Sequence, residues 1–363
     1  MARASRATHQ RWLADLTDVA TAPGRESLIQ AWVRRWAAKR ALTVVEDDAG
    51  NLLIRPALRS RKPPIVAVAH MDHPAMVVTR SWKRSEVELR GGVFPEYLIH
   101  HPRLQVETAS GPRLGRLEEF DPSTDRGWIA IGGNGEAEAG DIVRWAFSPT
   151  SLGIQGDRLR ARACDDLAGA AAALSVLDRL ATAEVGHFAV LLTRAEEVGL
   201  VGAIAACELK TLPPGARVLS IECSRESGDA PVGGGPIVRV GDASSVFTSD
   251  LTNRVAETAK SAAIPHQRKL MAGGVCEATA FAALGYETTG LCLALDNYHN
   301  MVDIDGVRSG RRKGRLGPEA ISLSDFHGLV DLLEAVAIGL DSTKSSVSKR
   351  LRKLYAEEKH ILR

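Results

Sequence analysis

Two adjacent glutamates, Glu196 and Glu197, end an apolar run in the stretch LLTRAEEVGLVGA, residues 191–203. Successive side chains of a strand point to opposite faces, so neighbouring carboxylates at a strand end either face solvent or perform separate tasks in one pocket. One carboxylate can bind a metal ion while the other moves a proton, and hydrolysis of an amide bond requires both tasks. The pair is therefore a candidate for hydrolytic chemistry.

Other potential metal ligands stand at the ends of predicted strands and at the start of a predicted helix. The motifs are AHMDHPA with His70 and Asp72, ACDDLAG with Asp165 and Asp166, SIECS with Glu222, and LDNYHN with His299. Each motif alone has an ordinary structural explanation, such as a helix N-cap, a solvated loop or a core histidine. Ligand sites of open α/β sheets lie beyond the carboxyl ends of the strands, so their common position indicates a site for divalent metals.

The elements that must position these residues follow from hydrophobic periodicity. Buried strands are expected at 63–70, 187–193, 216–222 and 288–295, and a pair of strands around a turn at 49–51 is expected within 42–56. Helices are expected at 166–181, at 277–285 with Gly285 closing the helix, and at 322–340 with Ser324 as N-cap. In a helix over 25–40, Leu28, Trp32 and Trp36 form one apolar face. This alternation predicts an α/β domain.

Between residues 76 and 160 the pattern changes to short β-like runs separated by Gly and Pro, including VELRGGVFPE, GDIVRWAF and LGIQGDRLRAR. Such spacing predicts an inserted small β-barrel or sandwich. We therefore expect a discontinuous catalytic domain at 1–75 and 161–341, a β-rich insert at 76–160 and a basic C-terminal tail at 342–363.

Composition excludes several classes of protein. Of 363 residues, 45% are hydrophobic and 25% charged, the formal net charge is +2, and no apolar stretch approaches the length of a membrane span. Neither nucleic-acid binding nor membrane attraction is therefore expected. The five cysteines have no CxxC spacing and the N-terminus has no apolar signal region, so we expect a cytoplasmic protein without a disulfide framework.

The order His-x-Asp, Asp-Asp, Glu-Glu-x-Gly, a later acidic residue and a late His resembles that of the co-catalytic dizinc aminopeptidases. The tetrahedral (TET) type, which includes deblocking and glutamyl aminopeptidases, is the most similar. The resemblance extends to about residue 340 and includes the inserted β domain. It implies a three-layer α/β/α metallopeptidase domain with a mixed sheet, a homo-oligomeric assembly and removal of N-terminal residues from peptide substrates.

The resemblance also implies a role for each motif residue. Two divalent ions, most plausibly zinc with cobalt or manganese as alternatives, would share Asp165; His70 and Glu222 would complete one set of ligands, and Glu197 and His299 the other. Asp72 would orient the His70 ring, and Glu196 would be the general base. Two such ions ~3.5–4 Å apart can hold a bridging hydroxide whose pKa is lowered toward 7.

The sequence departs from the TET pattern at several positions. Glu222 replaces the usual Asp, His73 replaces the Glu that follows His-x-Asp, and GGVCEATAF replaces the late GGTDA, so that Cys276 and Glu277 become the candidates for substrate contact. The stretch LDNY also stands where the family has RY and one further residue. These departures leave two alternatives open, a deacylase or other amide hydrolase on the same site and a non-catalytic binding or assembly protein on the same scaffold.

Two basic stretches are not explained by the motifs. The segment RSGRRKGRLGPE, residues 308–319, is interpreted first as a solvated loop and alternatively as a rim of the cleft that attracts acidic peptides. The tail after residue 341 is a basic helix for oligomer contacts or a frayed end.

Overall fold

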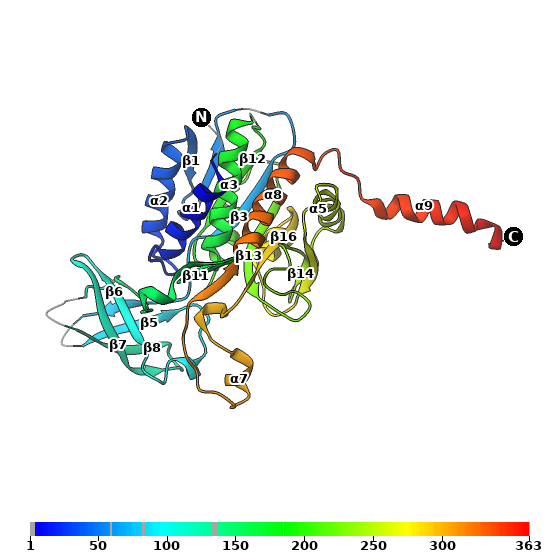
Figure 1. Ribbon diagram of the computed structural model, residues 1–363. Coiled ribbons are helices and arrows are strands. Elements are labelled where there is room, and N and C mark those ends of the chain that lie inside the picture. Colours follow the sequence, from blue (N-terminus) through cyan, green and yellow to red (C-terminus); the bar gives the residue numbers. More distant parts are fainter. Residues whose placement is uncertain (1–3, 59, 82–83, 133–136, 184, 363) are drawn as a thin grey trace.

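The computed structural model describes residues 4–362 except 59, 82–83, 133–136 and 184. Its main body is one mixed sheet covered by helices on both faces (Figure 1). The strands lie in the order β1 (Leu42–Glu46), β2 (Leu52–Pro56), β12 (Phe188–Thr193), β3 (Ile65–His70), β13 (Arg217–Arg225), β16 (Glu287–Leu295), β14 (Ile237–Asp242) and β15 (Gln267–Met271). The four central strands β12, β3, β13 and β16 are parallel, so their carboxyl ends meet at one edge.

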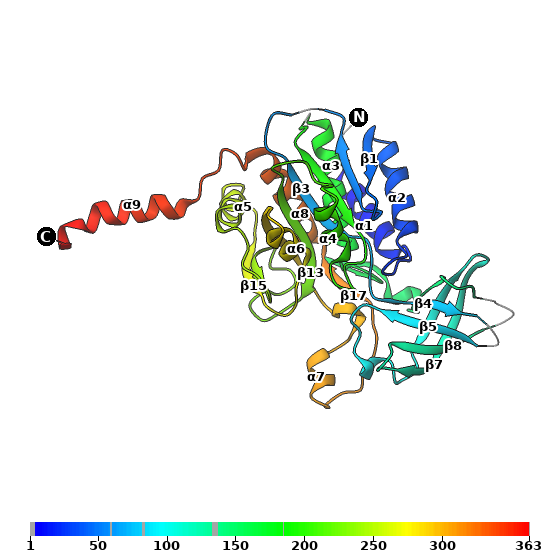
Figure 2. The ribbon, with the colours of Figure 1, turned by 180° about the vertical axis from the view of Figure 1, so that it is seen from behind.

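The alternation of side chains along β3 divides the core into two layers. Ala67 and Ala69 pack on one side and Val66 and Val68 on the other. The first side carries α1 (Arg6–Asp18), α2 (Ser27–Ala38), α3 (Leu167–Thr182), α5 (Ser249–Ser261) and α8 (Leu323–Gly339). The second carries α4 (Val201–Glu208) and α6 (Glu277–Ala283), seen in front in Figure 2. The predicted three-layer α/β/α architecture is confirmed.

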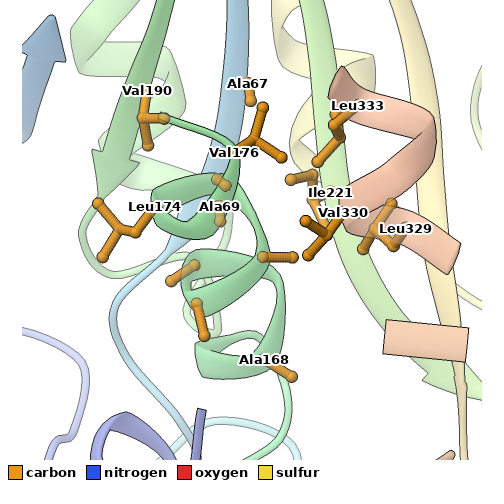
Figure 3. Packing of buried hydrophobic residues seen from close by; sticks show 14 of the residues in the cluster. Ala67, Ala69, Ala168, Leu174, Val176, Val190, Ile221, Leu329, Val330 and Leu333 are labelled. Atoms are coloured by element: carbon orange, nitrogen blue, oxygen red, sulfur yellow. The ribbon is translucent and has the colours of Figure 1, made fainter. Parts of the chain in front are cut away.

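Figure 3 shows the buried side chains through which α3 and α8 pack on the centre of the sheet. Leu174 and Val176 of α3 lie beside the small side chains Ala67 and Ala69 of β3, and Val330 of α8 lies beside Ile221 of β13. Small residues on a central strand let helices approach closely, and close approach maximises the apolar area that is removed from water.

The structure also shows the end of α6, the N-cap of α8 and the buried face of α2. Gly285 follows α6 with φ +96°, as expected for a helix that a glycine closes. The N-cap of α8 is Ser322 rather than Ser324, because the Ser322 hydroxyl accepts the Asp325 amide at 3.1 Å. The predicted apolar face of α2 is only partly right: Trp36 is buried and Trp32 packs against the core, but Leu28 is 49% exposed, and the buried stripe is Ile29, Val33, Trp36 and Ala37.

The inserted β domain is a closed six-stranded barrel below the main body (Figure 1). Its strands are β4 (Ala75–Arg80), β5 (Ser85–Arg90), β8 (Arg126–Ile131), β7 (Gly111–Asp121), β6 (Arg103–Thr108) and β9 (Ile142–Trp145), with short 3₁₀ helices at Pro95–Tyr97 and Pro149–Ser151. The run at 152–162 lies outside this barrel: β10 (Gly153–Gln155) and β11 (Arg158–Ala161) pair with β17 (Glu319–Ser322) in a separate sheet.

Two further helices lie outside the main body, and the first of them contributes Ile304 and Val307 to the barrel core. The short α7 (Ile304–Arg308) lies beside the barrel, and α9 (Ser346–Glu358), which continues into a 3₁₀ turn at Lys359–Leu362, extends away from the body (Figures 1 and 2). Within the described residues, no helix is both long and apolar enough to cross a membrane.

Candidate metal centre

The parallel strands bring the predicted ligands together at one edge of the sheet. His70 is the last residue of β3, and Glu196 and Glu197 come shortly after β12. Glu222 lies within β13, which continues to Arg225, rather than after the strand. Asp165 lies two residues before the start of α3, in a cis peptide bond with Asp166, and His299 belongs to a 3₁₀ turn, Tyr298–Asn300, that follows β16.

Asp165 lies between the two histidines. Its Oδ1 is 3.2 Å from His70 Nε2, and its Oδ2 is 3.6 Å from His299 Nε2. Glu222 Oε1 is 3.6 Å from His70 Nε2, and Glu197 Oε2 is 3.3 Å from His299 Nε2. All five side chains are at most 9% exposed. The arrangement is that of one central carboxylate with a histidine–carboxylate pair on each side.

Backbone carbonyl groups determine which nitrogen of each histidine carries the proton. His70 Nδ1 lies 3.1 Å from the Asp72 carbonyl oxygen, and His299 Nδ1 lies 2.7 Å from the Gly92 carbonyl oxygen. A carbonyl oxygen only accepts, so Nδ1 donates in both rings and the neutral tautomer leaves a lone pair on Nε2. Both Nε2 lone pairs therefore point toward Asp165. A cation between the Asp165 carboxylate and either ring could be coordinated by that lone pair.

Asp72 acts on the glutamate pair more directly than on the His70 ring. Its two carboxylate oxygens accept the backbone amides of Glu196 at 3.0 Å and Glu197 at 3.1 Å, and Oδ1 lies 3.6 Å from His70 Nδ1. The side chain thus fixes the backbone that carries both glutamates, and its main-chain carbonyl orients the histidine.

The site concentrates negative charge in a buried volume. Burial and the charge of Asp165 raise the pKa of Glu222 to about 8, and burial raises the pKa of Glu196 well above its usual range. Burial alone would raise the pKa of Asp165. Its hydrogen bonds to the His299 and His70 rings have the larger effect and lower that pKa.

Several of these atoms lack hydrogen-bond partners among the described residues. Three buried atoms have no such partner: Asp165 Oδ1, Glu197 Oε1 and His299 Nε2. Burial of a polar atom without a hydrogen bond costs free energy unless a further group, such as a metal ion, interacts with it. The possible ligand atoms of His70, Asp165 and Glu197 lie within 4.8 Å of one another, as do those of Asp165, Asp166 and Glu222. Carboxylates and imidazoles in this number are suitable ligands for divalent ions, so the residues present fit a metal centre.

Sequence reasoning missed Glu319, on which both sides of the centre depend. This fully buried residue of β17 accepts the backbone amides of Cys164 at 2.6 Å and Asp165 at 3.2 Å through Oε2, and the amide of His299 at 2.9 Å through Oε1. Burial raises its pKa to about 7, partly offset by His73. Its local sequence, PEAIS, carries no motif that could have identified it.

His73 contacts the main chain of the central ligand, Asp165. Its Nδ1 lies 2.7 Å from the carbonyl oxygen of Asp165, and its Nε2 lies 3.1 Å from Asn300 Oδ1. The residue that departs from the family pattern thus holds the backbone of the central ligand.

A cavity of about 380 Å³ opens directly onto this cluster. Its wall includes Asp165, Glu196, Glu197, Glu222 and His299, together with the basic residues Arg225, Arg239 and Lys269. Cys276 and Glu277 are not on this wall: Cys276 packs against Phe247 and Ala278, and Glu277 is 1% exposed at the start of α6. The prediction that these two residues contact substrate is not supported, because the segment before them, Leu270–Val275, lines the cavity instead.

Arg239 differs from the other basic residues of the cavity. Arg225 pairs with Asp305 at 3.1 Å, and Lys269 pairs with Asp229. Arg239 is 2% exposed, its Nη1 donates to Ser224 Oγ at 3.3 Å, and its buried Nε has no hydrogen-bond partner among the described residues. No carboxylate oxygen of the described chain lies within ion-pair distance of its guanidinium group.

The basic segment 308–315 does not border this cavity. None of its residues is on the cavity wall, and Arg312 pairs with Asp303 at 3.0 Å while 73% of its side chain is exposed. The solvated-loop interpretation is therefore favoured over the cleft-rim hypothesis.

The fold agrees with comparisons to known proteins. Residues 133–312 match the family model of the M42 glutamyl aminopeptidases. Solved structures with the same fold include a TET aminopeptidase from a marine-sediment archaeon of the Thaumarchaeota (TM-score 0.74, 22% identity, 91% of this chain and 96% of that chain). They also include the TET1 peptidase of Pyrococcus horikoshii (0.72, 23%, 92% and 99%) and an aminopeptidase from Desulfurococcus kamchatkensis (0.73, 18%, 93% and 98%). The resemblance to TET-type aminopeptidases is confirmed.

Proposed function

We propose that this protein is a metal-dependent aminopeptidase that removes N-terminal residues from peptides. The observation that carries the proposal is the position of Asp165, whose two carboxylate oxygens face the Nε2 atoms of His70 and His299 separately. A carboxylate shared in this way can bridge two ions, each completed by a histidine and a further carboxylate.

Asp165 would be shared, His70 and Glu222 would hold one ion, and Glu197 and His299 would hold the other. Zinc is the first choice for this nitrogen and oxygen ligand set, with cobalt and manganese as alternatives. When bound, two such ions supply Lewis-acid polarisation of a carbonyl and lower the pKa of a water molecule.

Glu196 is the proposed general base. It lines the cavity beside the ligands, and the hydrogen bond from its backbone amide to Asp72 fixes its position. In this role its carboxylate takes the proton of the attacking water and delivers it to the nitrogen of the leaving amine. Glu196 and Glu197 thus have different roles in this proposal, although they are neighbours in the sequence. Glu196 transfers the proton, and Glu197 binds a metal ion.

The cavity favours an acidic side chain on the residue to be removed. Arg239 is a buried cation without a carboxylate partner among the described residues, and Lys269 and Arg225 lie on the same wall. A substrate carboxylate in the cavity that bonds to the Arg239 guanidinium group would compensate the buried charge, and such charge-assisted bonds contribute about 1.5–3 kcal/mol.

We further propose a homo-oligomeric assembly, by analogy with relatives whose structures contain closed particles. The TET1 peptidase of Pyrococcus horikoshii assembles into a tetrahedron or a large octahedral shell. In this proposal the catalytic domain comprises residues 1–75 and the segment from β10 through α8, and the barrel between them is the insert.

The test combines metal content with activity. Wild type and Glu196→Gln are loaded with zinc and measured by mass spectrometry, and hydrolysis of glutamyl and leucyl amides is assayed alongside. Both proteins should bind about two ions per chain, and only wild type should hydrolyse the amides. Glu208→Gln on the exposed surface of α4 makes the same chemical change and should behave as wild type.

Two results would overturn the proposal. Wild type that binds no metal and hydrolyses nothing would favour a non-catalytic role. Faster hydrolysis of N-acyl amino acids than of aminoacyl amides would favour a deacylase.

A further inference from the structure

The C-terminal helix α9 presents an apolar stripe that nothing in the described chain covers. Every described residue of Ser346–Leu362 is exposed, Ser348 left aside. The stripe consists of Val347, Leu351, Leu354, Tyr355, Ile361 and Leu362, which are 37–79% exposed. Figures 1 and 2 show the helix extending away from both the sheet and the barrel.

A helix of this length has little stability by itself in water. Isolated helices shorter than about 12–15 residues are marginal, and α9 has 13 residues with no core contact to stabilise it. The exposed apolar residues from Val347 to Tyr355 also form a surface of the kind that soluble proteins usually cover. Both facts indicate a partner for α9.

The spacing of the stripe is that of a two-helix seam. With Leu351 at heptad position a and Leu354 at d, Val347 and Ile361 also fall at d. The steps from Val347 to Leu351 and from Leu351 to Leu354 are the four and three residues of a coiled coil, and Glu358 occupies the a position before Ile361. Strong basic residues occupy the opposite, outward positions: Lys349 at f, Arg352 at b and Lys353 at c. Like charges thus lie away from the seam.

The charges beside the seam specify the partner. Arg350 and Glu357 occupy successive g positions and have opposite signs. In an antiparallel pair of identical helices the g positions of the two chains face each other, so Arg350 of each helix meets Glu357 of the other. The helix is therefore complementary to a second copy of itself, in the two-fold arrangement that is usual for identical subunits.

We propose that α9 pairs antiparallel with α9 of a second copy of this chain and links two subunits. The pairing buries Leu351 of one helix against Leu354 of the other, twice per pair. A seam of about two heptads is weak by itself, but it adds to contacts between the bodies because linked sites bind at high effective concentration.

A lipid surface fits the helix less well. Glu358 falls at position a, within the apolar stripe between Leu354 and Ile361, and Glu357 borders it. Insertion of the stripe into an anionic membrane would bury or repel these two carboxylates. In the antiparallel pair, Glu358 lies near the end of the seam, level with Val347 of the other chain and near the basic residue Lys344 that precedes that helix.

Chemical cross-linking of the full chain tests the pairing. The double variant Arg350→Cys/Glu357→Cys is treated with a short bismaleimide and run on a denaturing gel. The control, Lys349→Cys/Ala356→Cys, places the thiols at two f positions with the same separation, about 10 Å along the helix. Antiparallel pairing predicts a covalent dimer as the main product of the first variant and monomer as the main product of the control.

A further substitution tests the seam itself. Adding Leu351→Asp to the first cysteine pair should abolish the dimer, while aminoacyl-amide hydrolysis remains at the level of the parent. Equal cross-linking of the two cysteine pairs, or none in either, overturns the proposal. Co-sedimentation with vesicles of 30% phosphatidylserine in phosphatidylcholine, without dimer formation, would assign the helix to lipid instead.

Discussion

Asp72 holds Glu196 through the main chain: a carboxylate oxygen of Asp72 accepts the Glu196 amide at 3.0 Å. The other oxygen accepts the Glu197 amide at 3.1 Å. In Asp72→Asn, an NH₂ group would face one of these amides, so the strand end that carries the proposed base and a proposed ligand should shift. Loss of such supporting contacts usually lowers metal affinity or activity by about 10–100-fold.

Zinc titration and initial rates on the same samples measure this effect. We expect weaker zinc binding in Asp72→Asn, with part of the lost activity recovered at excess zinc. The exposed Asp48→Asn serves as the matched control. Wild-type zinc affinity and rate in Asp72→Asn would show that the two hydrogen bonds do not position the glutamates.

Substrate preference should depend on Arg239. Replacing it with Met removes the buried cation and keeps similar length, so hydrolysis of glutamyl amides should fall about 10–100-fold relative to leucyl amides. The measurement is the ratio of kcat/KM for the two substrates. An unchanged ratio would mean that Arg239 does not contact the substrate side chain.

The basic loop supplies the control for this experiment. Arg311→Gln/Arg312→Gln removes two charges from a segment that does not line the cavity, so the substrate ratio should stay at the wild-type value. A lower ratio in this variant would assign acidic preference to long-range attraction by the loop rather than to the cavity wall.

Metal removal should destabilise the folded protein. The crowded carboxylates at the site favour the bound form, and a ligand at 100 times its Kd adds about 2.7 kcal/mol to the free energy of unfolding. Thermal unfolding followed by circular dichroism should therefore show a lower Tm after chelation, restored by zinc. In Asp165→Asn the Tm should no longer respond to zinc, and an equal response in both proteins would place the metal elsewhere.

The cap of α8 offers a test of local stability. Ser322→Ala removes the hydroxyl that accepts the Asp325 amide and should cost about 1 kcal/mol of unfolding free energy. Ser324→Ala removes a hydrogen bond to Asp157 at the exposed start of the helix and should cost less than about 0.5 kcal/mol. Urea denaturation measures both, and the reverse order would restore Ser324 as the functional cap.

The central strands and the site could both be predicted from the sequence because one sequence pattern indicates the strand and the position of the ligand that follows it. An apolar run that stops at a polar residue marks a buried parallel strand and its carboxyl end. His70, Glu197 and His299 could thus be assigned to one edge before any contact was known. Edge strand β15 was missed because its exposed positions alternate with half-buried ones, which leaves a polar run, QRKLM.

Other parts of the site could not be inferred in this way. The Gly92 carbonyl is a backbone group that any residue would provide, and Glu319 acts from a short strand near the end of the chain. The face of α2 was misassigned because two stripes that share Trp36 fit helical spacing, and only the packing of Ile29 and Val33 against the sheet distinguishes them. Such choices depend on tertiary contacts rather than on periodicity.

The hydrogen bond from His299 Nδ1 to the Gly92 carbonyl joins the proposed catalytic domain to the segment that follows barrel strand β5. One proposed metal ligand therefore depends for its tautomer and orientation on a piece of chain from the insert. A minimal enzyme made by excising the barrel and rejoining its ends would leave this imidazole free to rotate. The orientation of this proposed ligand thus depends on the insert, and an exchange of inserts between relatives should preserve a carbonyl group at the position of Gly92.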